Sequence, residues 1–315
     1  MHYSVLLNEA IDSLNIDENG IYVDATLGYG GHSSLILSKL NKGFLYSFDQ
    51  DIDAINYSND RLSKISNSYE IIKSNFVNLK EELKKKNIDK INGIIFDLGV
   101  SSPQLDEKAR GFSYHQDSRL DMRMDKDNPF SAYEVVNNYS KNDLIKIFRD
   151  YGEEKFAVSI ANNILKYREK KNIETTLELV DIIKLSVPER VKREKNPAKK
   201  VFQAIRIEVN NELDVLSKAL EDAISILKPG GRIVVITFHS LEDRIVKNIF
   251  KKYSEVPKDL KVLPFVPLEY QPILKLINKD VILPSKKELE ENRRSRSAKM
   301  RIAERIRWFY FEKKN

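Results

Sequence analysis

The sequence predicts a doubly wound, Rossmann-like α/β fold that carries an inserted helical subdomain after its fourth strand. Short apolar runs alternate with amphipathic segments in the first hundred residues. From about residue 109 to 200 the apolar residues recur at helical spacing and no comparable strand appears, and then the alternation resumes. Apolar strands separated by amphipathic helices are typical of a parallel sheet that helices cover on both faces.

Four strands and three helices are expected before the insertion. The strands are Ile21–Ala25, Phe44–Phe48, Tyr69–Ile72 and Gly93–Asp97. The helices between them are Ser34–Leu40, Asp51–Leu62 and Asn78–Lys86. The insertion shows two capping-box patterns, Ser140 with Asp143 and Thr175 with Glu178, next to apolar residues at helical spacing.

The alternation returns in the C-terminal part. One apolar stripe predicts a single long helix over residues 202–227, stopped by the glycines after Pro229. Beyond it we expect a strand, a helix and two further strands, namely Arg232–Phe238, Leu241–Tyr253, Leu274–Ile277 and Ala298–Ile306. We therefore assign residues 1–108 and 201–315 to one discontinuous domain and residues 109–200 to the helical insertion.

The composition excludes several classes of protein. The chain of 315 residues is 41% hydrophobic and 32% charged, as in folded globular proteins. It has no cysteine, which excludes disulfides and thiolate metal sites and suits a reducing compartment. No apolar run approaches the length of about 18 residues that a membrane span needs, and the first residues do not resemble a signal peptide. A cytoplasmic location is expected.

The charge favours an anionic partner. The formal net charge is +6, and basic residues concentrate in two runs, Arg190–Lys200 and Arg293–Arg301. One such run is usually a solvated face, whereas two together favour binding to a polyanion.

A glycine-rich loop predicts a nucleoside site. Gly28, Gly30 and Gly31 follow the first strand and open a helix, and Asp49 ends the second strand. Such a loop lets a ligand approach the backbone, and a carboxylate at this place can take both hydroxyls of a ribose. The third glycine comes too early for the dinucleotide pattern. The spacing alone leaves the nucleoside open. S-adenosylmethionine has no pyrophosphate, but it carries an amino-acid group that an acid and a glycine turn can hold. Phe76 is expected either to stack on an adenine or to pack in the core.

Polar residues crowd the exit of the fourth strand. The segment Asp97–Asp106 lies where ligands bind in such sheets, beside the glycine loop. Placed beside that loop, the segment can meet both a methyl donor and its acceptor. Ser101, Ser102 and nearby carbonyls are the candidates for contact with the acceptor, with Asp97 as the nearest charge.

Together, several segments resemble the family of bacterial 16S ribosomal RNA cytosine-N4 methyltransferases, ribosomal small-subunit methyltransferase H. The segments cover nearly the whole chain in the family's order, and they are Asp24–Ser33, Asp97–Asp106, Gly111–Ser113, Leu120–Asp125, Phe202–Asn210, Phe238–Arg244 and Arg296–Lys299. Arg119 and Arg293 stand where the family usually has proline, which puts the local loop geometry in doubt.

The resemblance implies a class I methyltransferase sheet, S-adenosylmethionine as cofactor and a cytidine in the decoding region of 16S ribosomal RNA as substrate, within the small ribosomal subunit. It implies cofactor contacts at Gly30, Gly31, His32, Asp49, Phe76, Asp97 and Gln104. The helical insertion is then expected to recognise RNA. No metal is expected, and the oligomeric state stays open.

The RNA contacts are less sharply predicted. The base must leave its stack to reach the pocket, and Phe112, Tyr114 and Phe238 are candidates to receive it or are core residues. The candidates for contacts to the RNA are His115, Asp121, Arg123, Arg206 and His239. Structural histidines and a pairing of Asp121 with Arg123 remain open alternatives.

Two other functions remain open at this point. One is an NAD-dependent oxidoreductase, which the early third glycine and the polar strand exit argue against. The other is an RNA-binding assembly factor with a vestigial cofactor loop, which the intact Asp24, Asp49 and Asp97 argue against.

Overall fold

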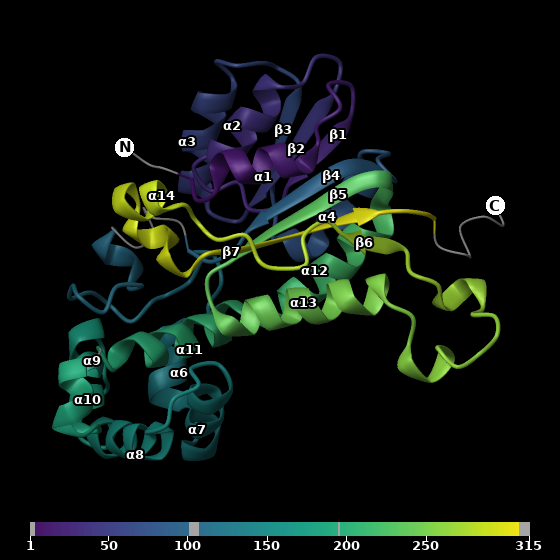
Figure 1. The fold of residues 1–315 in the computed structure, drawn as a ribbon. Helices are drawn as coiled ribbons and strands as arrows, with labels where there is room; N and C mark the ends of the chain where they lie inside the picture. Colours follow the sequence, from purple (N-terminus) through teal and green to yellow (C-terminus); the bar gives the residue numbers. More distant parts are fainter. Residues whose placement is uncertain (1–3, 101–106, 195, 309–315) are drawn as a thin grey trace. The chain divides into compact units, whose positions relative to one another are not determined.

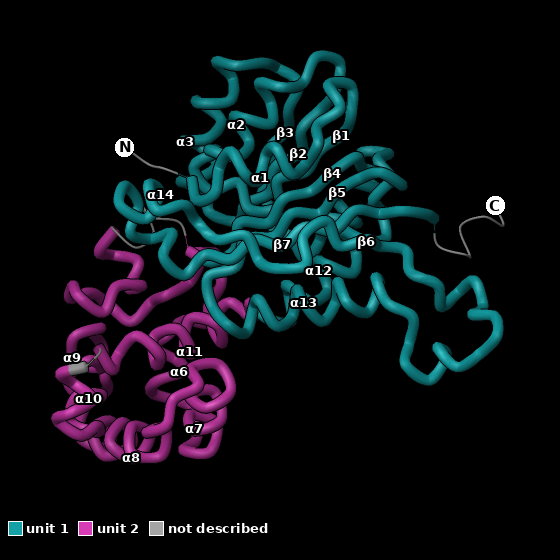
Figure 2. Tube along the Cα trace, in the orientation of Figure 1, with its two compact units in different colours: residues 1–99, 213–315 teal, residues 100–212 magenta. Residues whose placement is uncertain are grey.

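The computed structural model describes residues 4–100, 107–194 and 196–308, which form two compact units (Figure 2). Unit 1 comprises Met1–Gly99 and Leu213–Asn315, and unit 2 comprises Val100–Glu212. The predicted insertion, residues 109–200, lies inside unit 2, which also takes in helix α11 (Ala198–Asn210). Among the described residues, no helix is both long and apolar enough to cross a membrane.

Unit 1 is built on a seven-stranded sheet with the order β3-β2-β1-β4-β5-β7-β6 (Figure 1). The strands are β1 (Ile21–Asp24), β2 (Phe44–Asp49), β3 (Tyr69–Lys73), β4 (Ile91–Asp97), β5 (Leu227–Thr237), β6 (Leu274–Leu276) and β7 (Lys299–Arg305). Strands β1 to β5 pair in parallel, and β7 is antiparallel to both β5 and β6. The class I methyltransferase sheet predicted from the sequence is confirmed.

Helices cover both faces of this sheet. They are α1 (Leu7–Leu14), α2 (Gly31–Ser38), α3 (Ile52–Leu62), α4 (Leu79–Lys85), α12 (Glu212–Ile226), α13 (Ser240–Ser254) and α14 (Lys286–Glu291). Successive residues of β4 point to opposite faces, so Phe96 joins a core with α12 and α13 and Ile95 joins a second core with α1 and α2. Helices α1 and α14 were not predicted.

Unit 2 is helical and has a core of its own. Its helices are α6 (Ala132–Asn138), α7 (Lys141–Asp150), α8 (Ala157–Arg168), α9 (Thr176–Leu185), α10 (Glu189–Glu194) and α11. Both predicted helix starts are confirmed, because Ser140 caps α7 and Thr175 forms a capping box with Glu178. Leu144, Phe148 and Phe202 are among the side chains buried in the core.

The prediction of one long helix over residues 202–227 is wrong. Helix α11 ends at Asn210, Asn211 adopts a left-handed φ of 48°, and α12 begins at Glu212. Asparagine tolerates this conformation better than most residues. The apolar stripe continues across the break, because residue spacing alone does not register a single left-handed residue.

The short 3-10 helices lie in the connections: η1 (Phe76–Asn78), η2 (Lys108–Arg110), η3 (Lys258–Leu260), η4 (Leu268–Tyr270) and η5 (Arg293–Ser297).

Candidate active site

The parallel register brings three carboxylates to one edge of the sheet. Asp24 ends β1, Asp49 ends β2 and Asp97 ends β4, and β1 pairs with both neighbours. The carboxyl ends of parallel strands are where ligands bind in doubly wound folds. The sequence-based prediction of the cofactor site used this rule, and the described structure brings these residues to the same edge.

The glycine loop follows β1. Gly28 has a φ of 49° and Gly30 a φ of 72°, a region that other residues enter only with strain. A Cβ at Gly30 would also lie 3.1 Å from Oγ of Ser58. Helix α2 begins at Gly31, and the first N–H groups of a helix have no partner within it. The first turn of α2 is therefore a place where a ligand can accept backbone N–H groups.

Asp24 fastens this loop to the sheet. Its Oδ2 accepts a hydrogen bond of 2.7 Å from Oγ of Ser33, and its Oδ1 accepts one of 3.1 Å from N–H of Thr26. The side chain is buried, and burial raises its pKa to about 6. Oγ1 of Thr26 in turn accepts a hydrogen bond of 2.6 Å from N–H of Asp97, which ties the loop to β4.

Asp49 accepts backbone N–H groups through both carboxylate oxygens. Oδ2 accepts the N–H of Gly28 at 2.9 Å, and Oδ1 accepts the N–H of Asp51 at 2.9 Å. Burial raises the pKa of Asp49 to about 6, against backbone hydrogen bonds that act to lower it, one of them from Gln50. The two oxygens of a carboxylate offer about four acceptor positions, so Asp49 keeps acceptor capacity beyond these contacts. A ribose hydroxyl would use it.

One carboxylate oxygen of Asp97 is buried and lacks a hydrogen-bond partner within the described part of the chain. Among the described residues nothing donates a hydrogen bond to its Oδ1, and its Oδ2 lies 3.6 Å from Nδ1 of His32. Burial raises the pKa of Asp97 well above its usual range, and the charges of Asp24, Glu242 and Glu288 raise it further. A buried unpaired acceptor is costly. Oδ1 of Asp97 is therefore suited to accept a hydrogen bond from an N–H group of a ligand.

His32 is a buried neutral base. Its side chain is 4% exposed, its Nε2 lies 3.1 Å from the carbonyl oxygen of Val5, and burial lowers its pKa to about 4. Phe76 is half-buried, and its ring meets that of Phe96 edge-on at 5.7 Å. The ring packs in part against the core of the sheet, and stacking of Phe76 on the adenine stays a prediction. Ser101, Ser102 and Gln104 lie outside the described residues.

Two of the predicted RNA contacts in unit 2 form hydrogen bonds with each other. Arg123 donates hydrogen bonds to both carboxylate oxygens of Asp121, at 2.9 and 2.7 Å, and to the carbonyls of Lys126 and Asn128. Burial acts to raise the pKa of Asp121, but the hydrogen bonds from Arg123 outweigh it and hold that pKa below its usual value. The structure therefore contains the pairing of Asp121 with Arg123 that the sequence left open as an alternative.

Arg206 makes a similar bidentate pair, with two 2.8 Å hydrogen bonds to the carboxylate of Glu212. His115 is exposed, and its ring lies 4.4 Å from that of Tyr114. Of the predicted RNA contacts in unit 2, His115 is therefore the most accessible.

Two residues of unit 2 have roles that the sequence did not suggest. Asn210 accepts the N–H of Met124 at 2.8 Å and donates to the carbonyl of Met122, which has a φ of 60°. Arg110 is buried and donates to the carbonyls of Arg123 and Met124. Both residues hold the loop over Leu120–Asp125 in shape. In the sequence, the only hint of the role of Arg110 is its place directly before Gly111 and Phe112.

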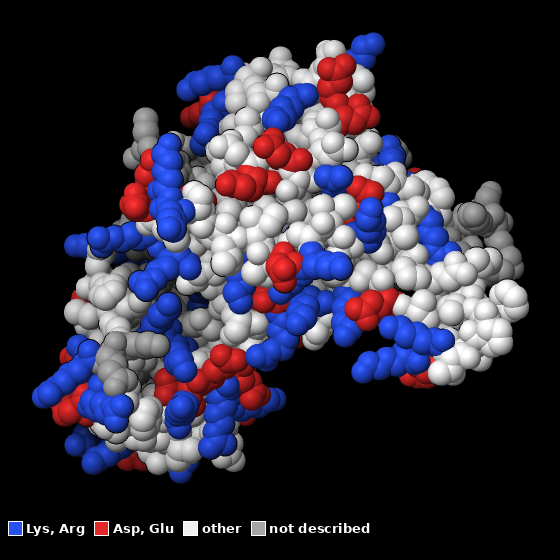
Figure 3. Space-filling model, viewed as in Figure 1, with Lys and Arg blue, Asp and Glu red and all other residues white. Residues whose placement is uncertain are grey.

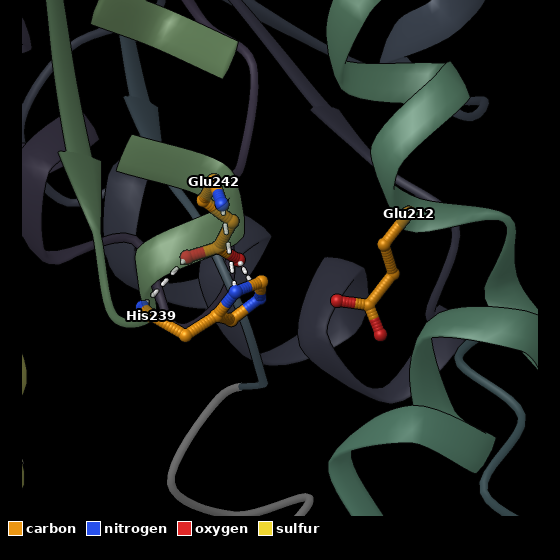
Figure 4. Close-up of side chains that lie close together, drawn as sticks. All are labelled: Glu212, His239 and Glu242. Carbon is orange, nitrogen blue, oxygen red and sulfur yellow. Dashed lines mark hydrogen bonds and ion pairs between the residues drawn. The ribbon is translucent and has the colours of Figure 1, made fainter. Parts of the chain in front are cut away.

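His239 is the N-cap residue of helix α13. Its Nδ1 lies 3.5 Å from N–H of Glu242, and its Nε2 lies 3.0 Å from Oε1 of Glu242, off the direction of a good hydrogen bond (Figure 4). Glu242 accepts the N–H of Phe238 at 2.7 Å and is buried. Glu212, also drawn, belongs to unit 2. His239 thus caps the helix, which agrees with the alternative that it is a structural histidine.

The basic runs are only partly paired. In the second run Arg301 grips Asp243 through two hydrogen bonds and Lys299 lies 3.5 Å from the same carboxylate, whereas Arg293 and Arg296 are exposed. Figure 3 shows lysine and arginine side chains gathered over α14 and the residues that follow it.

Solved structures of similar fold include methyltransferases. An rRNA methylase from Streptococcus thermophilus is 13% identical with a TM-score of 0.45, the match covering 98% of this chain and 100% of that one. SMU.1697c from Streptococcus mutans, solved in complex with SAH, is 14% identical with a TM-score of 0.45, covering 97% and 100%. These values are too low to assign a function.

Nearly the whole chain matches one protein family. A family model described as the MraW methylase family matches residues 1–306. The predictions of a methyltransferase and of S-adenosylmethionine as its cofactor are confirmed, and the alternative of an NAD-dependent oxidoreductase is excluded. The chain belongs to the MraW methylase family.

Proposed function

We propose that the chain transfers a methyl group from S-adenosylmethionine to the N4 amine of a cytidine in the decoding region of 16S ribosomal RNA. The substrate is the small ribosomal subunit in the cytoplasm. The observation that carries the proposal is the carboxylate edge of unit 1 beside the glycine loop, where Oδ1 of Asp97 accepts no hydrogen bond from any residue that the structure describes. The resemblance of Asp97–Asp106, Leu120–Asp125 and Phe238–Arg244 to the cytosine-N4 family supplies the substrate.

The residues present fit the cofactor. Asp49 would hold the ribose hydroxyls, the backbone of Gly30 and Gly31 would line the ligand, and Asp97 would accept hydrogen bonds from the amino-acid end. Phe76 would contact the adenine. S-adenosylmethionine supplies the methyl group as an electrophilic carbon on its sulfonium sulfur.

The chain must then orient the acceptor amine and take a proton from it. The lone pair of a cytosine amine is delocalised into the ring, so an oxygen that accepts its N–H makes the nitrogen a better nucleophile. Ser101 and Ser102 follow Asp97 directly and are our first candidates for that acceptor. Asp97 is the second, because its raised pKa makes it a better proton acceptor than an ordinary carboxylate.

Mass spectrometry of ribosomal RNA tests the proposal. RNA from a strain that lacks the gene should miss one methyl group on a cytidine, and the wild-type gene should restore it. The variant Asp97→Asn should not restore it. A complete set of cytidine methyl groups in the deletion strain would contradict the substrate.

The same strains test the assembly-factor hypothesis. If the chain only binds RNA, Asp97→Asn should support subunit assembly as well as the wild type does, and the deletion strain should accumulate unassembled subunits with unchanged methylation.

A further inference from the structure

The N-terminal segment Ser4–Leu6 lies directly on the start of α2. An ideal Cβ built at Gly31 would be 1.8 Å from Oγ and 3.0 Å from Cβ of Ser4, so a side chain at this position would displace the Ser4 hydroxyl. The carbonyl oxygen of Val5 lies 3.1 Å from Nε2 of His32. Gly31 and His32 belong to the proposed cofactor site, so the segment packs directly against two of its residues.

A residue from the other end of the chain holds this segment in place. Oε1 of Glu288, on α14, accepts the N–H of Leu6 at 2.8 Å. Figure 1 shows α14 beside the start of α1. Leu6 is fully buried and has a φ of 50°, a left-handed conformation that is unfavourable for a leucine. A strained residue persists only where its surroundings hold it, and the hydrogen bond from Leu6 to Glu288 is one of the contacts that do so.

Glu288 is diverted from the role that its position in the helix suggests. Ser285 caps α14, and a glutamate three residues after the cap usually accepts the N–H of the cap residue. The N–H of Glu288 does donate to Oγ of Ser285, at 3.2 Å, but its own carboxylate goes to Leu6. Replacing the Glu288 side chain therefore leaves the Ser285 cap intact.

We propose that Glu288 is a positioning residue of the methyl-donor site, acting through the N–H of Leu6 to press Ser4–Leu6 against Gly31 and His32. The inference rests on the cofactor site described above. It assigns a role in cofactor binding to a residue that is nearly the whole length of the chain away from the glycine loop.

Three variants test this with S-adenosylmethionine as the probe. Calorimetry on full-length Glu288→Ala should show a dissociation constant raised about tenfold, since a hydrogen bond to a charged group is lost. Glu288→Gln keeps an oxygen that accepts the N–H of Leu6 and should stay within about twofold of the wild type. Glu291→Ala, an exposed residue at the end of the same helix, should leave the affinity unchanged.

The glutamine variant separates positioning from charge. Glu288 lies near enough to Asp97 to raise its pKa, so its charge could itself favour a cationic ligand. In that case Glu288→Gln would weaken binding as much as Glu288→Ala. That outcome would overturn the proposal, as would unchanged affinity in Glu288→Ala.

Hydrogen exchange gives a second readout on the protein without cofactor. The amide of Leu6 should exchange faster in Glu288→Ala than in Glu288→Gln. Equal exchange in the two variants would contradict the proposal. If the wild type itself does not bind S-adenosylmethionine, the proposed cofactor site is wrong. That result is distinct from a failure of the Glu288 proposal, in which the wild type binds and the variants do not differ as expected.

Discussion

At the scale of single residues, Asp49 carries the sharpest prediction for the cofactor. Its two oxygens accept the N–H groups of Gly28 and Asp51, and we expect the same carboxylate to accept the ribose hydroxyls. Asp49→Ala should weaken S-adenosylmethionine binding by about 1.5–3 kcal/mol, the range for hydrogen bonds to a charged group. Calorimetry measures this. Asp60→Ala, an exposed change on α3, is the matched control, and an unchanged affinity in Asp49→Ala would remove Asp49 from the site.

The same carboxylate makes cofactor binding depend on pH. The folded-state pKa of Asp49 is about 6, above its unfolded value, so the stability this group contributes is present below about pH 4 and is lost as the pH rises through 6. Cofactor affinity has the opposite sign, because only the ionised carboxylate accepts both hydroxyls. Affinity should fall up to about tenfold per pH unit below 6.

Titrations across this range check the prediction. In Asp49→Asn the dependence on pH should be weaker than in the wild type. It should not vanish, because Asp24 also has a pKa of about 6 and underlies the loop. If the wild-type affinity is the same at about pH 5 and pH 8, an ionised Asp49 is not needed for binding.

Ser102 carries the prediction for the chemical step. Positioning the acceptor amine is worth several kcal/mol, so Ser102→Ala should slow single-turnover methylation about tenfold to a thousandfold while cofactor affinity barely changes. Leu98→Val, a conservative change at a buried residue, is the packing control. Should Ser101→Ala and Ser102→Ala both methylate at the wild-type rate, the acceptor is a main-chain carbonyl or another side chain.

At the scale of elements, the basic run Arg190–Lys200 tests whether unit 2 binds RNA. Lys192 pairs with Glu189 and Lys200 donates to the carbonyl of Glu153, whereas Arg193 and Lys199 are exposed. Neutralising all four should weaken binding to purified small subunits. It should also flatten the plot of log affinity against log salt by about 1 to 3 in slope, because each phosphate contact adds about 0.7 to 0.9.

The control for that experiment is an equal loss of charge elsewhere in unit 2. Lys141, Lys146, Lys166 and Lys170 are exposed on or beside α7 and α8. If both quadruple variants change the salt slope equally, the run at Arg190–Lys200 has no special role. Cofactor affinity should not change in either.

Elements with a strong local signal could be predicted from the sequence. The alternation of apolar strands and helices located β1 to β5, and the pattern of Thr175 with Glu178 located a helix start. The carboxylate edge followed from topology alone, because parallel strands end at the same edge. The break at Asn211 could not be predicted, since it changes one backbone angle and leaves the apolar spacing intact.

Long-range contacts could not be predicted from the sequence, because a local pattern does not show which distant residue a side chain meets. Gly31 was explained by the approach of a ligand, but the structure places Ser4 against it as well. The pattern of Ser285 and Glu288 would have suggested a local capping box, and the carboxylate instead accepts the N–H of Leu6. A local pattern shows which hydrogen bonds a side chain can make, and the tertiary fold decides which it does make.

At the scale of the whole molecule, the two units have separate cores. The cores of unit 1 lie on the two faces of the sheet, and that of unit 2 lies among α6 to α11. The residues assigned to the cofactor site are all in unit 1, apart from Gln104, which lies outside the described residues. Separate cores allow separate unfolding transitions, and a ligand stabilises only the unit that binds it.

The single tryptophan makes this testable. Trp308 lies in unit 1, with the ammonium of Lys90 at 4.9 Å and the guanidinium of Arg305 at 5.5 Å from its ring. Its fluorescence therefore follows the unfolding of unit 1, while circular dichroism follows the helices of both units. S-adenosylmethionine at about 100 times its dissociation constant should stabilise the fluorescence transition by about 2.7 kcal/mol. The part of the dichroism change that comes from unit 2 should not shift. Coincident transitions that move together on adding the cofactor would show instead that the units unfold as one.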